Sequence, residues 1–201
     1  MTESRLLVIA CGALAREIRD VIDMSAFDRV DVECLPAILH NTPESIPAAV
    51  EGRLDAAEGR YRSVFVAYAD CGTGGLLDRV LEKRGIQRLP GAHCYEFYAT
   101  GPHFAALHGR EPGTFYLTDF LTRHFDRLVW SGLGLDRWPE LRDDYFGNYR
   151  RLVYLSQVES EALIDVARDA SARLGLEFEH RHVGYGDLAT TLVEVTQGVP
   201  A

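Results

Sequence analysis

Two patterns of hydrophobic residues alternate along the chain. Short apolar runs typical of buried strands occupy residues 6–10, 63–68, 114–121 and 151–155, and further strand-like segments lie at 30–35, 86–89 and 176–180. Between several of these runs, apolar residues recur every three or four positions, as on the buried face of an amphipathic helix. The helical repeats begin near Leu14, Leu76 and Leu163. Strands that alternate with helices predict an α/β fold.

The size and composition of the chain are consistent with one core. It has 201 residues, of which 47% are hydrophobic, and we therefore expect a single α/β domain over residues 1–201, with a mainly parallel sheet flanked by helices. The segments 63–89 and 151–180 both read as strand, polar loop, helix, glycine and short strand. They resemble degenerate copies of one βα design, although no fixed period demonstrates a duplication.

Charge and hydropathy limit the choice of partners. The formal net charge of -9 disfavours binding of nucleic acid or of an anionic membrane through bulk charge, which leaves small molecules or other proteins. No apolar run approaches the roughly 20 residues that cross a bilayer, and the first apolar run is soon interrupted by Arg16, Glu17 and Arg19, unlike a signal peptide. A cytoplasmic protein is expected, in which cysteines are reduced, reactive or metal-bound.

Three of the four cysteines follow predicted strands. Cys11 ends the first apolar run, Cys71 follows the run at 63–68, and Cys94 follows the short segment at 86–89. In an open α/β sheet, ligands bind at the carboxyl ends of the strands, so we expect these loops to meet in one crevice. By the same argument Ser156 or Gln157, after the run at 151–155, would form a polar wall of that crevice. Cys34 is interpreted as a small buried residue near a strand end.

The loop around Cys71 is also rich in glycine. Glycines at a strand-to-helix junction let the backbone approach a ligand, and the helix that follows offers unpaired N–H groups. The residues expected to contact a cofactor in this way are Gly12, Gly72, Thr73 and Gly74. Neither a Walker lysine nor the full dinucleotide-binding spacing is present, so nucleotide binding is not favoured.

Short motifs throughout the chain resemble one family. They are Ala-Cys-Gly-Ala-Leu at 10–14, Asp-Cys-Gly-Thr-Gly-Gly at 70–75, His-Cys-Tyr-Glu at 93–96, Phe-Tyr-Leu-Thr-Asp-Phe at 115–120 and Gly-Asn-Tyr at 147–149. With these motifs the chain resembles the family catalogued as domain of unknown function 1638. No activity comes with this family. The resemblance implies a link to one-carbon metabolism, because relatives are encoded near corrinoid proteins and methylamine- or betaine-type methyltransferases.

The preferred hypothesis is a metal site made by Cys11, Cys71 and Cys94, with His93 or an exogenous ligand in the fourth position. Three thiolates suit a tetrahedral zinc ion or an iron–sulfur cluster with one unique iron. There is no Cys-x-x-Cys pair, so the hypothesis depends on the fold bringing the loops together. Asp70, His93 and Glu96 are the candidate catalytic proton carriers for a small-molecule substrate.

Three alternatives remain open. Cys71 alone could be a nucleophile or redox thiol, with His93 as its base. The protein could instead be a non-catalytic accessory that binds a corrinoid or methyltransferase partner. Finally, the cysteines could be packed residues and the glycine-rich turn plain loop geometry or an anion nest. Two late histidines, His180 and His182, share one side of a strand and could supply two metal ligands.

Overall fold

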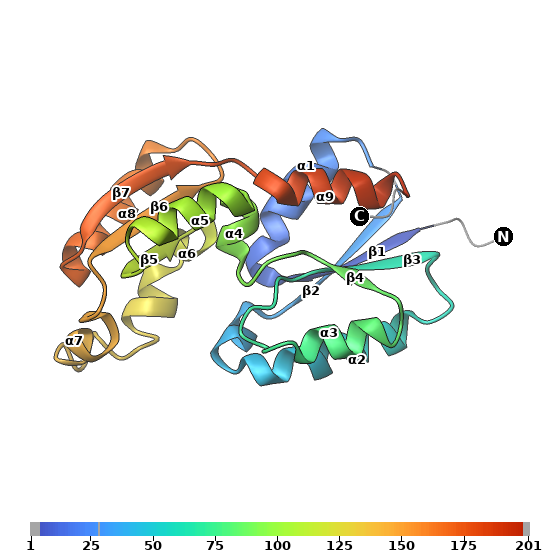
Figure 1. Cartoon of the computed structure of the whole chain (residues 1–201), viewed down its shortest axis with the longest axis horizontal. Coiled ribbons are helices and arrows are strands. Elements are labelled where there is room, and N and C mark those ends of the chain that lie inside the picture. Colours follow the sequence, from blue (N-terminus) through green and yellow to red (C-terminus); the bar gives the residue numbers. More distant parts are fainter. Residues whose placement is uncertain (1–4, 28, 199–201) are drawn as a thin grey trace. The chain divides into compact units, whose positions relative to one another are not determined.

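The strands form two all-parallel sheets flanked by helices, which confirms the α/β class. The computed structural model describes residues 5–27 and 29–198 (Figure 1). The chain divides into two compact units, Met1–Phe97 with Tyr185–Ala201, and Tyr98–Gly184. One mainly parallel sheet was expected, whereas the predicted strands are shared between a sheet in each unit.

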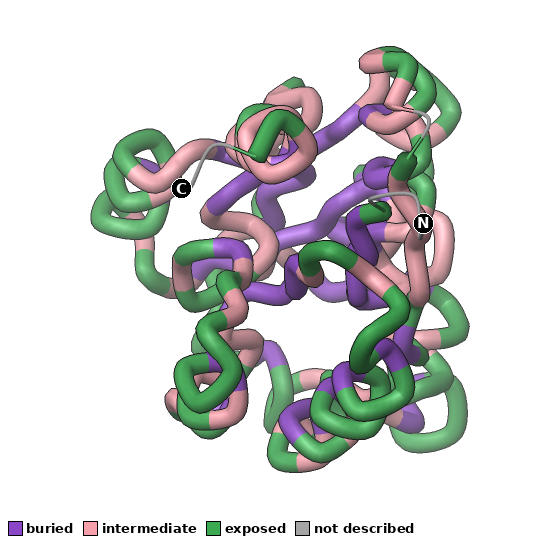
Figure 2. Tube along the Cα trace, turned by 90° about the vertical axis from the view of Figure 1, so that its right-hand side faces the viewer, coloured by how far each residue is buried: buried purple, intermediate pink, exposed green. Residues whose placement is uncertain are grey.

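The sheet of the first unit has the order β2-β1-β3-β4. Helices α1 and α9 cover one face and α2 and α3 the other (Figure 1). The bounds are β1 Leu6–Cys11, α1 Ala15–Met24, β2 Val30–Leu35, α2 Ile46–Ala57, β3 Ser63–Ala67, α3 Leu76–Glu82, β4 Gln87–Arg88 and α9 Gly186–Thr196. All six residues of β1 are buried, as expected for a strand covered on both faces. Figure 2 shows such buried segments in purple in the interior.

The second unit contains the sheet β5-β6-β7. The bounds are α5 Gly101–Arg110, β5 Thr114–Leu117, α6 Asp119–Arg123, a π-helix Asp126–Trp130, α7 Leu141–Phe146, β6 Arg151–Ser156, α8 Glu161–Leu174 and β7 Glu177–His182. Residues of α6, α7 and α8 pack with Leu152 and Tyr154 in one buried cluster. Helix α5 packs on Tyr116 of β5 through Phe104, with ring centroids 5.1 Å apart.

Most predicted elements form, with three local differences. The helical stretch between residues 94 and 110 is interrupted at Thr100, which has a φ of 62°, so α4 (Cys94–Ala99) and α5 are separate helices. After α6, residues 126–130 form the π-helix and not a continuation of the α-helix. Helix α9 was not predicted; its signal is the pair Leu188 and Leu192, both fully buried and four residues apart.

No helix in the described part of the chain is both long enough and apolar enough to span a membrane.

Candidate functional site

Cys11 and Cys71 lie at the same edge of the first sheet. Strands β1 and β3 are parallel neighbours, with Ala10 paired to Ala67, so the loops that follow them leave the sheet together. The buried Cys11 accepts a hydrogen bond at its sulfur from Ala13 N, 3.3 Å away. The next residue, Gly12, permits a close backbone approach, because a Cβ there would lie 3.0 Å from Leu35 O.

The loop after β3 folds around the carboxylate of Asp70. That carboxylate accepts hydrogen bonds from Thr73 Oγ1 (2.7 Å), Gly75 N (2.9 Å) and Gly74 N (3.1 Å). Burial acts to raise the pKa of Asp70, but these hydrogen bonds outweigh it and hold the pKa below its ordinary value. The N–H groups of Gly74 and Gly75 are therefore used by the loop itself.

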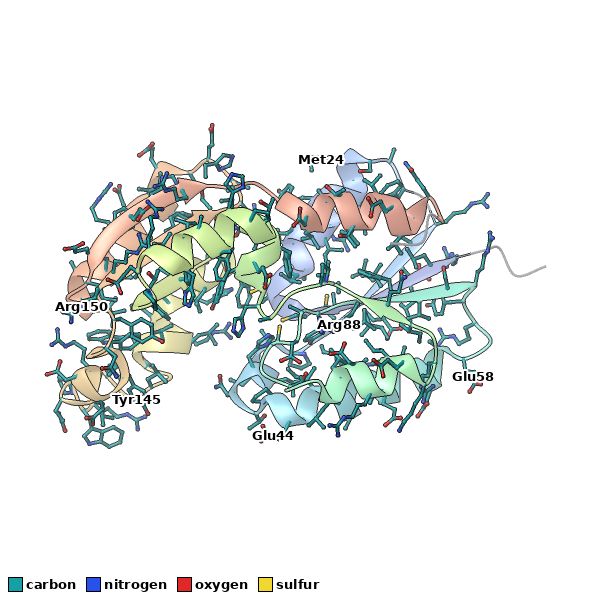
Figure 3. All side chains as sticks on the ribbon, in the orientation of Figure 1. Met24, Glu44, Glu58, Arg88, Tyr145 and Arg150 are labelled. Atoms are coloured by element: carbon teal, nitrogen blue, oxygen red, sulfur yellow. The ribbon has the colours of Figure 1, made fainter. Side chains whose placement is uncertain are left out.

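Backbone hydrogen bonds attach this loop to the one that carries Cys94. Asp70 N donates to Gly91 O at 3.1 Å, and Cys71 N donates to Ala92 O at 2.9 Å. Arg88, labelled in Figure 3, supports the same segment through Leu89 O, to which its Nη1 donates at 2.7 Å. The structure thus brings the three cysteine-bearing loops together in the first unit.

The other two predicted proton carriers lie in the Cys94 loop. Glu96 Oε2 accepts a hydrogen bond from Ala92 N at 2.9 Å, which closes the turn before α4. His93 is exposed, and its ring lies 6.1 Å from that of Tyr95. Ser156 and Gln157 were expected beside the cysteines. Ser156 ends β6 and Gln157 follows it in the second unit, so they do not belong to the sheet that carries the thiols.

The electrostatics of the three thiols are coupled. Burial raises the pKa of Cys11 from 9.0 to about 12 and that of Cys71 from 9.0 to about 11. Burial also raises the pKa of Cys94, and negative charge on Cys71 and Cys11 raises it further. Each thiolate would repel the next, so the thiols hold their protons in the absence of a bound cation.

A comparison with known protein families assigns the chain to one of them. The model described as "Protein of unknown function (DUF1638)" matches residues 34–192. The chain belongs to this family. The matched range includes Cys71 and Cys94 but begins after Cys11. No curated protein and no solved structure matches the chain.

Sequence reasoning missed two residues beside the thiols of this DUF1638 protein. Tyr68 is 1% exposed, and the side chain with which its hydroxyl interacts is the thiol of Cys11. Burial and the charges of Cys11 and Cys71 raise the pKa of Tyr68, so the hydroxyl stays protonated. The only sequence signal for it is a tyrosine at the end of an apolar strand.

The second missed residue is His40, in a stretch where no chemistry was expected. Its ring stacks on that of Tyr68 at 6.1 Å with an interplanar angle of 13°. Its Nδ1 lies 3.9 Å from Cys11 Sγ and 3.1 Å from Ala37 O. Although His40 is exposed as a residue, removal of its ring from water lowers its pKa, which keeps the imidazole neutral.

The side chains of the DUF1638 protein are not already arranged as a complete coordination shell. Within residues 5–27 and 29–198, no set of three His, Cys, Asp or Glu side chains is placed to hold a metal ion. Joint ligation by the three thiols therefore requires side-chain rotation.

Proposed function

We propose that this DUF1638 protein binds zinc or an iron–sulfur cluster through the thiolates of Cys11, Cys71 and Cys94. The observation that carries the proposal is the placement of the three cysteines at one sheet edge. Cys11 and Cys71 follow the neighbouring strands β1 and β3, and backbone hydrogen bonds join the loops of Cys71 and Cys94. Soft thiolate ligands select zinc, copper(I) or iron–sulfur clusters over hard cations. A cation would relieve the repulsion between the thiolates and displace their protons.

The backbone of Cys71 supports a functional role for its side chain. Its φ of 51° lies in the left-handed region, where a residue with a Cβ costs roughly 1–2 kcal/mol relative to the right-handed region. Glycine would remove this cost, and glycines already follow at 72, 74 and 75. A cysteine at this position is therefore explained by a need for its thiol.

Tyr68 and His40 fit the same proposal. The Tyr68 hydroxyl is a donor beside Cys11, and a deprotonated Cys11 would accept its hydrogen bond. A tetrahedral zinc ion with Zn–S near 2.3 Å and Zn–N near 2.05 Å separates sulfur and nitrogen by about 3.6 Å. The present distance of 3.9 Å between Cys11 Sγ and His40 Nδ1 is close to this value, which makes His40 a further candidate for the fourth ligand beside His93.

The reaction class depends on that fourth position. If an exogenous ligand fills it, the ion can activate a small substrate as a Lewis acid or handle a thiol or methyl group, with Asp70, His93 or Glu96 as proton carriers. If His40 fills it, the site is closed and the protein acts as an accessory to a corrinoid or methyltransferase partner in the cytoplasm. Turnover by the isolated protein supports the first role; affinity for a partner without turnover supports the second.

The competing hypothesis is a single nucleophilic or redox thiol at Cys71. A reactive thiol has a depressed pKa, whereas burial raises that of Cys71 to about 11. We therefore favour the metal site.

Protein purified without oxygen provides the test. Elemental analysis should find a stoichiometric metal, with a visible absorption band for an iron–sulfur cluster and a silent spectrum for zinc. Cys94→Ser should lose the metal, because it removes one of three thiolates. Cys34→Ser is the matched control: Cys34 is an exposed thiol on β2, and its replacement should leave the metal content unchanged. Full metal content and an unchanged spectrum in Cys94→Ser would refute the proposal.

A further inference from the structure

The second sheet carries a separate group of ligand side chains at its carboxyl edge. Ser156 ends β6 and His182 ends β7, and the two residues are register partners. His180 lies two residues before His182, so both rings project from the same side of β7. Parallel strands bring their carboxyl ends to one edge, which is where ligands bind in α/β sheets.

The two imidazoles converge on one atom. Ser156 Oγ lies 2.9 Å from His180 Nε2 and 3.2 Å from His182 Nδ1. A hydroxyl has one proton, so it can donate to only one of these nitrogens, and the other nitrogen must carry its own hydrogen to donate to the oxygen. His182 is exposed and would be free to extend into water. Instead it turns toward the buried Ser156, so two ring nitrogens and an oxygen face a common point.

The surroundings hold this group in place. The ring of His180 stacks on Tyr154, with centroids 5.3 Å apart. The Tyr154 hydroxyl donates to Asp119 Oδ1 at 2.6 Å, and Gln157 N donates to the same oxygen at 3.0 Å. The base of the group is therefore rigid, while the exposed His182 leaves its outer side open to water.

The charge around His180 is suited to a cation. The acidic residues Glu161 and Asp119 act on His180 by attracting positive charge, and Arg168 partly offsets them. Neutral imidazole nitrogens are the ligands that borderline divalent transition ions prefer.

We propose that His180 and His182 bind a divalent transition metal ion such as zinc, with Ser156 as a third oxygen contact and water in the open positions. Two nitrogens on a tetrahedral zinc ion lie about 3.3 Å apart. Each nitrogen is already within hydrogen-bond distance of the same oxygen, so small ring rotations bring both onto one ion. This site is independent of the thiol site in the first unit.

Cadmium NMR on the full-length protein tests the inference. The metal-free wild type is loaded with ¹¹³Cd²⁺, whose resonance lies far downfield with thiolate ligands and upfield with nitrogen and oxygen ligands. Two resonances are expected, and His182→Gln should remove only the upfield one. His103→Gln is the matched control, because His103 is also an exposed histidine of the second unit and its replacement should leave both resonances.

The zinc affinity of the His180/His182 site can be measured by competition with a chelator. It should fall at least about tenfold in His182→Gln and by a smaller factor in Ser156→Ala. The absence of an upfield resonance in wild type, or its persistence with unchanged affinity in His182→Gln, overturns the inference. If the wild-type spectrum lacks only the downfield resonance, the thiol site is refuted and the histidine site is not. Because His182 is exposed, its replacement should not disturb folding, which circular dichroism verifies.

Discussion

The buried polar groups at the carboxyl edges of the two sheets differ in their hydrogen-bond partners. At the first sheet, the buried Tyr68 hydroxyl interacts with the Cys11 thiol, and charge on Cys11 and Cys71 raises the pKa of Tyr68. At the second sheet, the side chain of Asp119 is 1% exposed but accepts from Tyr154, two backbone N–H groups and Arg123. Both edges come from parallel βα units, yet only the buried group at the second edge has four donors of its own.

This difference separates a structural role from the binding role that we propose. A buried carboxylate with several donors stabilises the fold by itself, so we assign Asp119 to the stability of the second unit. For the thiols of the first unit, binding is the role that we propose. The histidines at the second edge lie outside the Asp119 hydrogen bonds.

The largest expected effect comes from removing Asp119. Asp119→Ala leaves the Tyr154 hydroxyl, Gln157 N and Val158 N without their acceptor and should lower the free energy of unfolding by about 3 kcal/mol or more. Urea denaturation measures it.

Asp126→Ala is the control for that change. Asp126 pairs with Arg173 at 2.7 Å, but its side chain is 77% exposed, and the cost should stay below about 1 kcal/mol. Equal losses in the two variants would show that Asp119 does not organise the second edge.

Alkaline pH should act mainly on the first edge. The folded pKa values of Cys11 and Cys71, about 12 and about 11, exceed the ordinary value of 9.0, so the unfolded chain loses these protons first. The stability they contribute is complete below pH 9 and is lost as pH rises through the folded values. The slope is about 1.4 kcal/mol per pH unit for each thiol.

Urea denaturation of the metal-free protein between pH 8 and 11 can be compared with Cys11→Ser/Cys71→Ser. The free energy of unfolding of the wild type should fall more steeply with pH. Only the wild type has the two thiols whose protons the folded state retains and the unfolded chain loses. Parallel curves would mean that the thiols are not held in their protonated form by the fold.

The smallest effect concerns the backbone at Cys71. Cys71→Gly should be more stable than Cys71→Ala by about 1 kcal/mol in the metal-free state, because glycine adopts a φ of 51° without strain. Both variants should lose the metal. Thermal unfolding compares their stability; if alanine is tolerated as well as glycine, the strain argument for a functional thiol fails.

Much of the local structure could be predicted from apolar periodicity. The strands expected at 30–35 and 151–155 form as β2 and β6. Of the two side chains suited to cap α6, Thr118 and Asp119, Thr118 is the one that does so. Periodicity missed α9 and the break at Thr100. The position of the cysteines after strands could be predicted from the sequence, whereas no sequence motif indicates His40 or Tyr68. Their relation to Cys11 depends on contacts between residues 29 or more positions apart in sequence.

The sequence alone determined the α/β class, the order of the strands and of most helices, and the position of the cysteines at strand ends, because these follow from local periodicity and residue type. Only the tertiary structure decided which strands share a sheet, and hence that Ser156 and the histidines of β7 form a group apart from the thiols. Strand pairing depends on long-range packing and backbone hydrogen bonding. Apolar runs of similar composition do not specify which of them will pair.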